Sequence, residues 1–587
     1  MNVILSTLNS KYIHSNLAIR YLKEYVRDIV EVELAEFTIN QNLDEISGEL
    51  FKMNPDLIGF STYIWNVNEI LEIIERLKIV NPDLKIILGG PEVSYDSYEL
   101  LLNNPGIDFV IAGEGEETYK ELIQGRPLEE IKGLAFRRGE KIKVNIPRPL
   151  IKDINSIPSP YINIGDEYRN KIVYYETSRG CPFNCKFCLS STIRGVRYMN
   201  IERVKEDIDS LIDAGVKQVK FVDRTFNSNK KFSKAVMEHI ISRDPKEVNF
   251  HLELTAHLID DEQLEFLEDI KEGLFQFEIG VQSTNPQTIE AIGRTTDIEY
   301  LKKVSSKIKS FKNIHQHLDL IAGLPYENYN SFSKSFNSIY EIRPEKIQLG
   351  FLKLLKGSEI RQMSEKYGYK FLDKPPYEVL ENFYISYGEL LKLKHIENIV
   401  EKYYNEAYFE NSLDFIIKNN FHSAFLFYED FADYWDKKDL FKVSHKRNTL
   451  YTILQDYFLY KDLPDFELFS DILRFDYLSN NDNKGIPKEI ESKKQIGNKD
   501  MHKLLKDKNL LDDILESEKD TATKKLLLKT SISCFSYDIL EVIKSDFRKT
   551  EKIERVILFY YKNGVINRSS TYDVTDYLRR INNIYDK

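Results

Sequence analysis

The sequence has few cysteines and no long apolar segment, and these two absences exclude several classes of protein. Four cysteines among 587 residues are too few for the disulfide framework of a secreted chain, which favours a reducing, cytoplasmic location. No run of about 18 apolar residues occurs, so no membrane-spanning helix is predicted. The first residues lack a basic segment followed by an apolar one, so we expect no export signal.

The charge of the chain is also not that of a general nucleic-acid binder. The net charge is −11 and Lys and Glu alternate throughout, which disfavours binding along a phosphate backbone, although a local basic groove remains compatible with it. Apolar residues make up 42% and charged residues 30% of the chain, as in globular proteins. At roughly 150 residues per domain, we expect roughly three to five domains.

Short apolar runs alternate with amphipathic segments over about the first 125 residues. Examples are DLIGFSTYI (56–64), LKIILGG (84–90) and the amphipathic NLAIRYLKEYVRDIV (16–30). This alternation predicts a parallel sheet with helices on both faces, a doubly wound, Rossmann-like α/β domain. Ligands of such sheets bind at the carboxyl ends of the strands. There the sequence places small and turn-forming residues, which could alternatively serve only as tight turns. These crevice residues are Thr62, Tyr63, Gly89, Gly90, Gly113, Glu114 and Gly115.

A proline-rich segment separates this first series from a second one. Four prolines, at positions 147, 149, 158 and 160, predict an extended connector. Six further strand–helix units follow, from KIVYYETS (171–178) to KIQLGFLKL (346–354), and they indicate a partial parallel barrel with its chemistry at the carboxyl strand ends. From about residue 360, long helical patterns rich in Tyr and Phe predict a mostly helical domain. The predicted domains are 1–140, a linker at 141–168, 169–358 and 359–587.

Three of the four cysteines lie within eight positions of one another, in the segment RGCPFNCKFC (179–188). Thiolates are soft ligands that can converge on one metal centre. Zinc would need a fourth ligand or an open site with water, and no histidine lies between His14 and His239, so a local Cys₃His zinc site is unsupported. A disulfide would leave one thiol unpaired, and three unrelated buried cysteines would be unusual at this density. A four-iron cluster would leave one iron free to bind a reacting molecule. The predicted ligands are Cys181, Cys185 and Cys188.

The spacing Cys-x-x-x-Cys-x-x-Cys, with the aromatic Phe187 before the last cysteine, resembles the signature of the radical S-adenosylmethionine (radical SAM) superfamily. In that family the open iron is chelated by the amino and carboxylate groups of S-adenosylmethionine (SAM). Reductive cleavage of SAM then gives methionine and a 5′-deoxyadenosyl radical. The resemblance covers residues 170–355 or so and implies a partial (β/α)₆ barrel, in agreement with the six strand–helix units.

Polar residues at the later strand ends resemble SAM-binding motifs of the same family, in the same order. The resemblance implies that Asp223 holds the methionine amino group, although it could instead cap a helix. It places Glu253 near substrate and SAM, Gln282 and Asp319 near the ribose, and Arg294 at the methionine carboxylate, which suits a guanidinium. The implied SAM-binding set is Phe187, Asp223, Glu253, Gln282, Arg294 and Asp319.

The first domain resembles the cobalamin-binding domain of cobalamin-dependent radical SAM proteins, the class that includes the class B methyltransferases. The resemblance rests on the crevice residues and on the proline-rich connector, and it implies that the crevice residues bind cobalamin. The chain lacks one motif of cobalamin proteins. Those that ligate cobalt through a histidine carry Asp-x-His-x-x-Gly in the first strand-to-helix loop, whereas this chain has NSKYIHSNLA around His14. We therefore expect no protein ligand to cobalt and interpret His14 as an ordinary surface or helix-start residue. The last domain resembles an uncharacterised carboxyl-terminal domain of one subgroup.

Together the resemblances predict an oxygen-sensitive, cytoplasmic enzyme that uses a [4Fe–4S] cluster, SAM and cobalamin. The leading hypothesis is methyl transfer to an unactivated carbon of a substrate that the sequence does not identify. A second hypothesis is a cobalamin-dependent redox or rearrangement reaction without methylation. A third is a non-catalytic corrinoid-binding module with a structural cluster. We expect an electron donor such as flavodoxin or ferredoxin as partner, and neither a membrane nor a nucleic acid.

Overall fold

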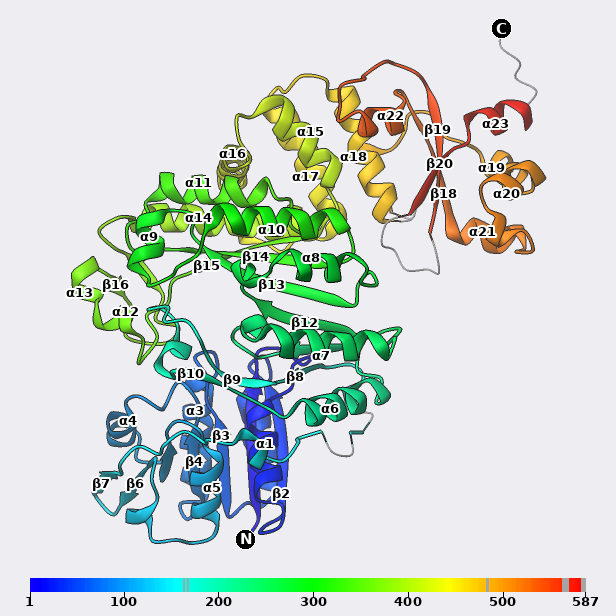
Figure 1. The fold of residues 1–587 in the computed structure, drawn as a ribbon. Helices are drawn as coiled ribbons and strands as arrows, with labels where there is room; N and C mark the ends of the chain where they lie inside the picture. Colours follow the sequence, from blue (N-terminus) through cyan, green and yellow to red (C-terminus); the bar gives the residue numbers. More distant parts are fainter. Residues whose placement is uncertain (162–163, 166–167, 482–484, 562–568, 582–587) are drawn as a thin grey trace. The chain divides into compact units, whose positions relative to one another are not determined.

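A computed structural model describes residues 1–161, 164–165, 168–481, 485–561 and 569–581, which form two compact units, Met1–Leu390 and Leu391–Lys587. The first unit contains two large sheets and the second is mostly helical (Figure 1). Within these described ranges, no helix combines the length and the apolar character that crossing a bilayer requires.

The first sheet has seven strands in the order β2-β1-β3-β4-β5-β6-β7. Its first five strands are parallel, as predicted, and the two at the far edge are antiparallel. The strands are β1 (Val3–Asn9), β2 (Val32–Thr38), β3 (Leu57–Ser61), β4 (Lys85–Gly89), β5 (Phe109–Ile111), β6 (Leu134–Arg138) and β7 (Lys141–Val144). The sequence analysis did not predict the β6–β7 hairpin, and β7 falls within the predicted linker.

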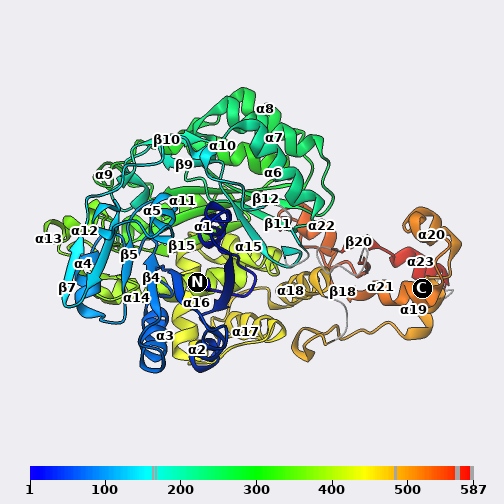
Figure 2. The same ribbon diagram turned by 90° about the horizontal axis from the view of Figure 1, so that it is seen from below.

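Helices cover both faces of this sheet, which makes the domain doubly wound as predicted. One core joins one face to α2, α3 and α4, and the other core joins the opposite face to α1 and α5. Figure 2 shows α1 and α5 on one side and α2 and α3 on the other. Alternate residues of β1 serve the two cores, with Ile4 and Leu8 in one and Val3 and Leu5 in the other. The helices are α1 (Leu17–Tyr25), α2 (Leu43–Lys52), α3 (Val67–Val80), α4 (Ser97–Asn103) and α5 (Glu116–Ile123).

The second sheet has six parallel strands in the order β15-β14-β13-β12-β11-β8, the partial-barrel arrangement that the sequence predicted. Its strands are β8 (Ile172–Tyr175), β11 (Gln218–Phe221), β12 (Asn249–Leu254), β13 (Phe275–Gln282), β14 (His315–Ala322) and β15 (Lys346–Phe351). Its helices are α6 (Ile201–Asp213), α7 (Lys230–Ser242), α8 (Asp261–Glu268), α9 (Pro286–Ala291), α10 (Ile298–Phe311) and α11 (Tyr329–Tyr340).

Local sequence signals set the ends of these helices. The side chain of Asn200 accepts a bond from the backbone N–H of Glu202 at the start of α6, and Asp260 with Gln263 forms a capping box at α8. An antiparallel hairpin of β9 (Ser178–Cys181) and β10 (Gly195–Tyr198) interrupts the first strand–helix unit. The last elements of the first unit are α12 (Glu359–Gln362), α13 (Ser364–Tyr367), β16 (Lys370–Phe371) and β17 (Val379–Glu381). The division between the two units falls within α14 (Tyr387–Ile399).

The second unit is mostly helical, as predicted, with a small sheet that the sequence analysis did not anticipate. Its sheet is antiparallel and consists of β18 (Thr530–Phe535), β19 (Arg555–Tyr560) and β20 (Ser570–Asp573). A π-helical turn (Val400–Asn405) precedes α15 (Glu410–Asn420), α16 (Ala424–Lys437), α17 (Arg447–Tyr460) and α18 (Phe466–Asn480). Later helices are α19 (Asn498–Leu504), α20 (Lys508–Asp513), α21 (Thr523–Lys529), α22 (Ile539–Lys544) and α23 (Thr575–Ile581). Most aromatic side chains of α16 and α17, such as Phe431 and Tyr457, are buried core residues, whereas Tyr460 is exposed.

Candidate functional site

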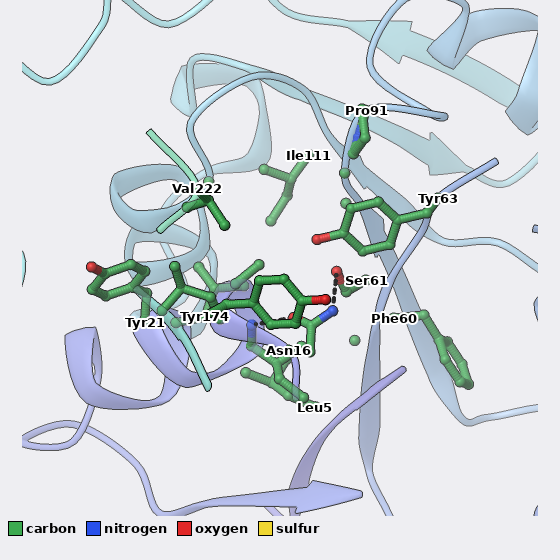
Figure 3. A pocket seen from close by; sticks show the side chains of 18 of the residues that line it. Leu5, Asn16, Tyr21, Phe60, Ser61, Tyr63, Pro91, Ile111, Tyr174 and Val222 are labelled. Atoms are coloured by element: carbon green, nitrogen blue, oxygen red, sulfur yellow. Dashed lines mark hydrogen bonds between the residues drawn. The ribbon is translucent and has the colours of Figure 1, made fainter. Parts of the chain in front are cut away.

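A cavity of about 620 Å³ lies at the carboxyl ends of the strands of the first sheet. Residues after β8 and β11 of the second sheet also line it, so both sheets contribute to its wall. Figure 3 shows Tyr63 from the first domain and Tyr174 and Val222 from the second around this space. The cavity is therefore where the Rossmann-like prediction placed a ligand, and it faces the barrel.

Six of the seven crevice residues line this cavity, and Thr62 does not. Thr62 is fully buried, and its backbone N–H donates to the Gly89 carbonyl at 2.7 Å. The next residue of that turn, Gly90, has φ +119°, and a Cβ there would lie 2.4 Å from the Thr62 carbonyl oxygen. Glycine is thus required at position 90 for close approach of two backbones, and Thr62 provides the backbone that Gly89 and Gly90 contact.

His14 lines the same cavity and is tied to the second domain. Its Nδ1 lies 2.8 Å from the Tyr174 hydroxyl. The neighbouring backbone pairs with Ile172, whose N–H donates to the Ile13 carbonyl at 2.6 Å, while the Ser15 hydroxyl donates to the Ile172 carbonyl at 3.0 Å. Burial, followed by nearby lysines, lowers the pKa of His14, so it is neutral at neutral pH. The absence of a bond between His14 and cobalt stays a prediction.

The three motif cysteines lie at and after the end of β9, and all three are half-buried. Burial raises the pKa of the Cys185 thiol, and Arg294 acts in the opposite direction. In the described part of the chain, no three His, Cys, Asp or Glu side chains are already gathered as metal ligands. In a four-iron cluster each thiolate binds a different iron, so the three thiols need not converge on a single ion. Phe187, between the second and third cysteine, is also half-buried.

Asp223 is completely buried and already bonded within the barrel. One oxygen accepts from the hydroxyls of Thr177 and Ser178 at 2.6 and 2.5 Å, and the other accepts from the Thr177 backbone N–H at 2.9 Å. Burial raises its pKa, and these three donors oppose the shift. Asp223 thus fixes the turn between β8 and the cysteine hairpin, and its contact with SAM stays a prediction.

The other predicted SAM residues contribute buried polar atoms that lack partners. Among the described residues, nothing donates to Gln282 Oε1 or Asp319 Oδ1, although both oxygen atoms are buried from solvent. Burial, followed by neighbouring carboxylates, raises the pKa of Asp319 and Glu253. Arg294 donates to the Gly280 carbonyl at 2.8 Å, which fixes its guanidinium beside β13. Unpartnered acceptors of this kind fit a ligand that brings hydroxyl groups.

Below these groups, a charged cluster that sequence reasoning missed fills the barrel interior. Lys220 and His251 lie 3.0 and 2.9 Å from the same Glu278 oxygen. Burial alone would raise the pKa of Glu278, but its bonds to His251 and Lys220 lower it. Gln276 lies 3.0 Å from His317 Nε2, and burial, with His315 nearby, lowers the pKa of His317 to about 3. The sequence contained one signal for this cluster. Charged or polar residues alternate with apolar ones in HLEL and HQHLDL.

A second missed cluster joins the cysteine hairpin to the first domain through Arg179. Its guanidinium lies 2.6 Å from Glu116 and 2.8 Å from Glu176. Arg197, on the opposite strand of the hairpin, pairs with Glu114 at 2.5 Å. Glu114, predicted to bind cobalamin, is thus held by ion pairs, and it also accepts from the Ile151 backbone N–H at 2.8 Å. Charged residues next to the cysteine motif were the only sequence signal for this contact.

Three family models match successive parts of the chain. Residues 4–123 match the B12 binding domain, residues 175–339 match the radical SAM superfamily, and residues 365–559 match a protein family of unknown function, DUF4080. The matched ranges contain the first sheet up to α5, the cysteine motif with most of the barrel, and much of the second unit.

Curated relatives are similar to about half of the chain at low identity. An uncharacterized methyltransferase, PH0819, of Pyrococcus horikoshii is 28% identical over 324 residues, 53% of this chain and 70% of that protein. The cobalamin-dependent radical SAM methyltransferase TokK of Streptomyces tokunonensis is 24% identical over 55% of this chain and 51% of TokK. An anaerobic magnesium-protoporphyrin IX monomethyl ester cyclase of Cereibacter sphaeroides is 23% identical over 51% and 52%. The match thus spans about half the length of the last two.

A solved structure shares the fold over a longer stretch. The cobalamin-dependent S-adenosylmethionine radical enzyme OxsB, with aqua-cobalamin bound, superposes with a TM-score of 0.59 over 83% of this chain and 82% of that one, at 15% identity. At this identity the likeness shows the fold alone.

These observations define the class of the protein. The chain is a radical SAM enzyme with an amino-terminal B12-binding domain. It carries a carboxyl-terminal DUF4080 region and is related to the class B radical SAM methyltransferases. Its domains imply, through their families, a [4Fe–4S] cluster, SAM and cobalamin.

Proposed function

We propose that this protein is a cobalamin-dependent radical SAM methyltransferase that acts on an unactivated carbon of a substrate not yet identified. One observation carries the proposal: the cavity at the ends of the first sheet is also lined by Tyr174, Val222 and Arg224, which follow or end strands of the barrel. A ligand in that cavity would therefore face the side of the barrel on which the predicted SAM residues lie.

The side chains present suit the three cofactors. The three motif thiols are soft ligands for a [4Fe–4S] cluster. The unpartnered acceptors of Gln282 and Asp319 suit hydroxyl groups of SAM, and the guanidinium of Arg294 suits its carboxylate. The cavity, with six of the seven crevice residues on its wall, would hold the corrinoid. When bound, these cofactors supply a carbon radical, made by reductive cleavage of SAM, and a transferable methyl group.

The residues of the chain bind and orient these groups. Ion pairs hold Arg179 and so fix the hairpin that carries Cys181. Tyr174 and Tyr63 narrow the cavity on two sides (Figure 3), which would exclude water from a bound macrocycle. Burial, followed by the neighbouring Glu278, raises the pKa of Glu253.

The names of the relatives support methylation over its alternative. Two of the three reported relatives are called methyltransferases, and the third is called a cyclase. The cyclase favours the second candidate, a cobalamin-dependent oxidation or rearrangement without methylation. We further propose a small redox protein such as flavodoxin or ferredoxin as electron donor and the cytoplasm as location.

The experiment that tests the proposal starts with anaerobic reconstitution of the full chain with iron, sulfide and hydroxocobalamin. We expect about four irons per chain, release of 5′-deoxyadenosine from SAM upon reduction, and deuterium in the corrinoid methyl group when the SAM methyl is deuterated. Replacing the three motif cysteines together with Ala should abolish the iron and the 5′-deoxyadenosine.

Two outcomes would redirect the assignment. Cleavage of SAM without any label in the corrinoid would favour the redox or rearrangement enzyme. A full iron cluster in the triple Ala variant, or no SAM cleavage under any reducing condition, would contradict the radical SAM mechanism itself and leave a corrinoid-binding module.

A further inference from the structure

The ion pairs around Arg179 leave one oxygen of Glu116 unused. Glu116 begins α5, its side chain is 7% exposed, and it lines the cavity. Its Oε1 lies 2.6 Å from the Arg179 guanidinium. No donor among the described residues reaches its other oxygen, Oε2, which is buried from solvent.

A buried carboxylate oxygen without a donor is costly, because the water that it loses on burial is not replaced. Arg179 donates to Glu176 through Nε at 2.9 Å and to Glu116 Oε1 through Nη2, and none of its N–H groups bonds to Oε2. Because Glu116 lines the cavity, a ligand bound there is placed to supply a donor. A ligand of this cavity with N–H groups on its edge would complete the arrangement.

We propose that Glu116 is a shared residue: Oε1 holds Arg179, while Oε2 accepts a hydrogen bond from a peripheral amide of the corrinoid. This inference rests on the proposed function, because it takes the corrinoid as the occupant of the cavity. A corrin ring carries primary amides on its periphery, and an amide N–H is a neutral donor suited to a buried carboxylate. Glu116 was not among the residues that the sequence assigned to cobalamin.

The second consequence concerns the cysteine hairpin. Arg179 lies two residues before Cys181 on β9, and two of its carboxylate partners, Glu114 and Glu116, belong to the first domain. A hydrogen bond from the corrinoid would fix the position of the Glu116 carboxylate. That carboxylate in turn holds Arg179. Glu116 is therefore a positioning residue for the hairpin, and by thermodynamic linkage the corrinoid and the cluster each influence the binding of the other.

The test compares Glu116→Gln with the matched control Glu117→Gln in the full chain. Glu117 is the next residue of α5, accepts from the Tyr25 hydroxyl and does not line the cavity. Hydroxocobalamin binding is titrated by its absorption spectrum. We expect Glu116→Gln to weaken binding about tenfold, which corresponds to about 1.4 kcal/mol, and Glu117→Gln to leave it unchanged.

A corrinoid whose peripheral amides are replaced by methyl esters provides a test on the unaltered protein. The wild type should bind this ester at least about tenfold more weakly than the amide corrinoid, and Glu116→Gln should bind the ester as the wild type does. This comparison keeps the inference testable if the Gln variant does not fold. Equal affinity of the wild type for both corrinoids, or hydroxocobalamin binding by Glu116→Gln at wild-type strength, overturns the inference.

The electron paramagnetic resonance spectrum of the reduced cluster reports the coupling to the hairpin. In the wild type the spectrum should change when hydroxocobalamin is added, and in Glu116→Gln, with equal iron content, the change should be lost. The same change in both proteins would overturn the positioning role. If the wild type binds no corrinoid, the proposed function fails together with this inference, whereas corrinoid binding that Glu116→Gln does not weaken refutes the inference alone.

Discussion

Replacing Gly180 with Ala should displace the first cluster cysteine. Gly180 lies in β9 directly before Cys181 and has φ +104°. A Cβ at this position would lie 2.1 Å from the carbonyl oxygen of Gly195 on the paired strand. Close C–H···O contacts between strands are about 3.3 Å long, so the two strands would have to separate by about 1.2 Å.

The cost follows from two contributions. An alanine held at this φ costs about 1–3 kcal/mol, and strand separation would break one or two hydrogen bonds, each worth about 0.5–1.5 kcal/mol. We therefore expect a local destabilisation of about 1.5–6 kcal/mol. Because β9 carries Cys181, iron incorporation should fall sharply, even where the rest of the barrel stays folded.

Gly195→Ala is the matched control in the same hairpin. Gly195 also has a positive φ, +81°, but no atom of the described residues would lie within 4 Å of a Cβ at this position. This variant thus carries the backbone strain without the contact. The assay is iron per chain after anaerobic reconstitution, together with the thermal midpoint. Equal iron content and equal midpoints for the two variants would refute the argument from close approach.

Three further predictions concern SAM, cobalt and the second unit. Arg294→Ala should weaken SAM binding by about 1.5–3 kcal/mol with the cluster intact, and unchanged affinity in equilibrium dialysis would contradict its assignment. His14→Ala should leave the spectra of bound cobalamin unchanged, whereas loss of nitrogen hyperfine structure would show that it ligates cobalt. Burial raises the pKa of Asp476 to about 7, against donors from Ser412 and Asn411. Asp476 therefore contributes most to the free energy of unfolding below about pH 4, and this contribution is lost as the pH rises through about 7. Asp476→Asn should make the free energy of unfolding depend less on pH in this range. The same pH dependence in the variant and the wild type would contradict the raised pKa.

The parallel strands were predictable because burial on both faces leaves a strong sequence pattern. Runs such as LKIILGG (84–90) are apolar at successive positions, and in the structure β4 supplies Ile86 and Leu88 to one core and Ile87 to the other. The cavity glycines were predictable for a related reason, since a backbone that approaches another closely, as at Gly90, tolerates no side chain.

The antiparallel strands were missed because their patterns are weaker. In the β6–β7 hairpin, Lys141 and Lys143 are exposed while Ile142 packs on the core, an alternation over too few residues to stand out. The turn at Gly139, with φ +60°, was the available signal. In the second unit, the run RVILFY (555–560) forms β19 within a region interpreted as helical. Its β-branched and aromatic residues favoured a strand.

Side-chain partners could not be predicted from the sequence, because they join elements that are distant along the chain. Glu116 and Arg179 are 63 residues apart, and Lys220 and Glu278 are 58 apart. The sequence supplies the residue types, but the pairing depends on how strands and helices pack. Asp223 shows the converse: its strand-end position was correct, while both of its oxygens are bonded to the preceding turn.

Buried ion pairs beside the cysteine motif join the hairpin of the barrel to the first domain. A guanidinium as buried as that of Arg179 requires carboxylate partners, because an unpaired buried charge costs several kcal/mol. The barrel itself provides Glu176, and the first domain provides Glu114 and Glu116. Without the first domain, the hairpin that carries Cys181 would keep one of three partners. The geometry of the cluster motif is therefore a property of both domains together, and the corrinoid cavity lies where they share these charges.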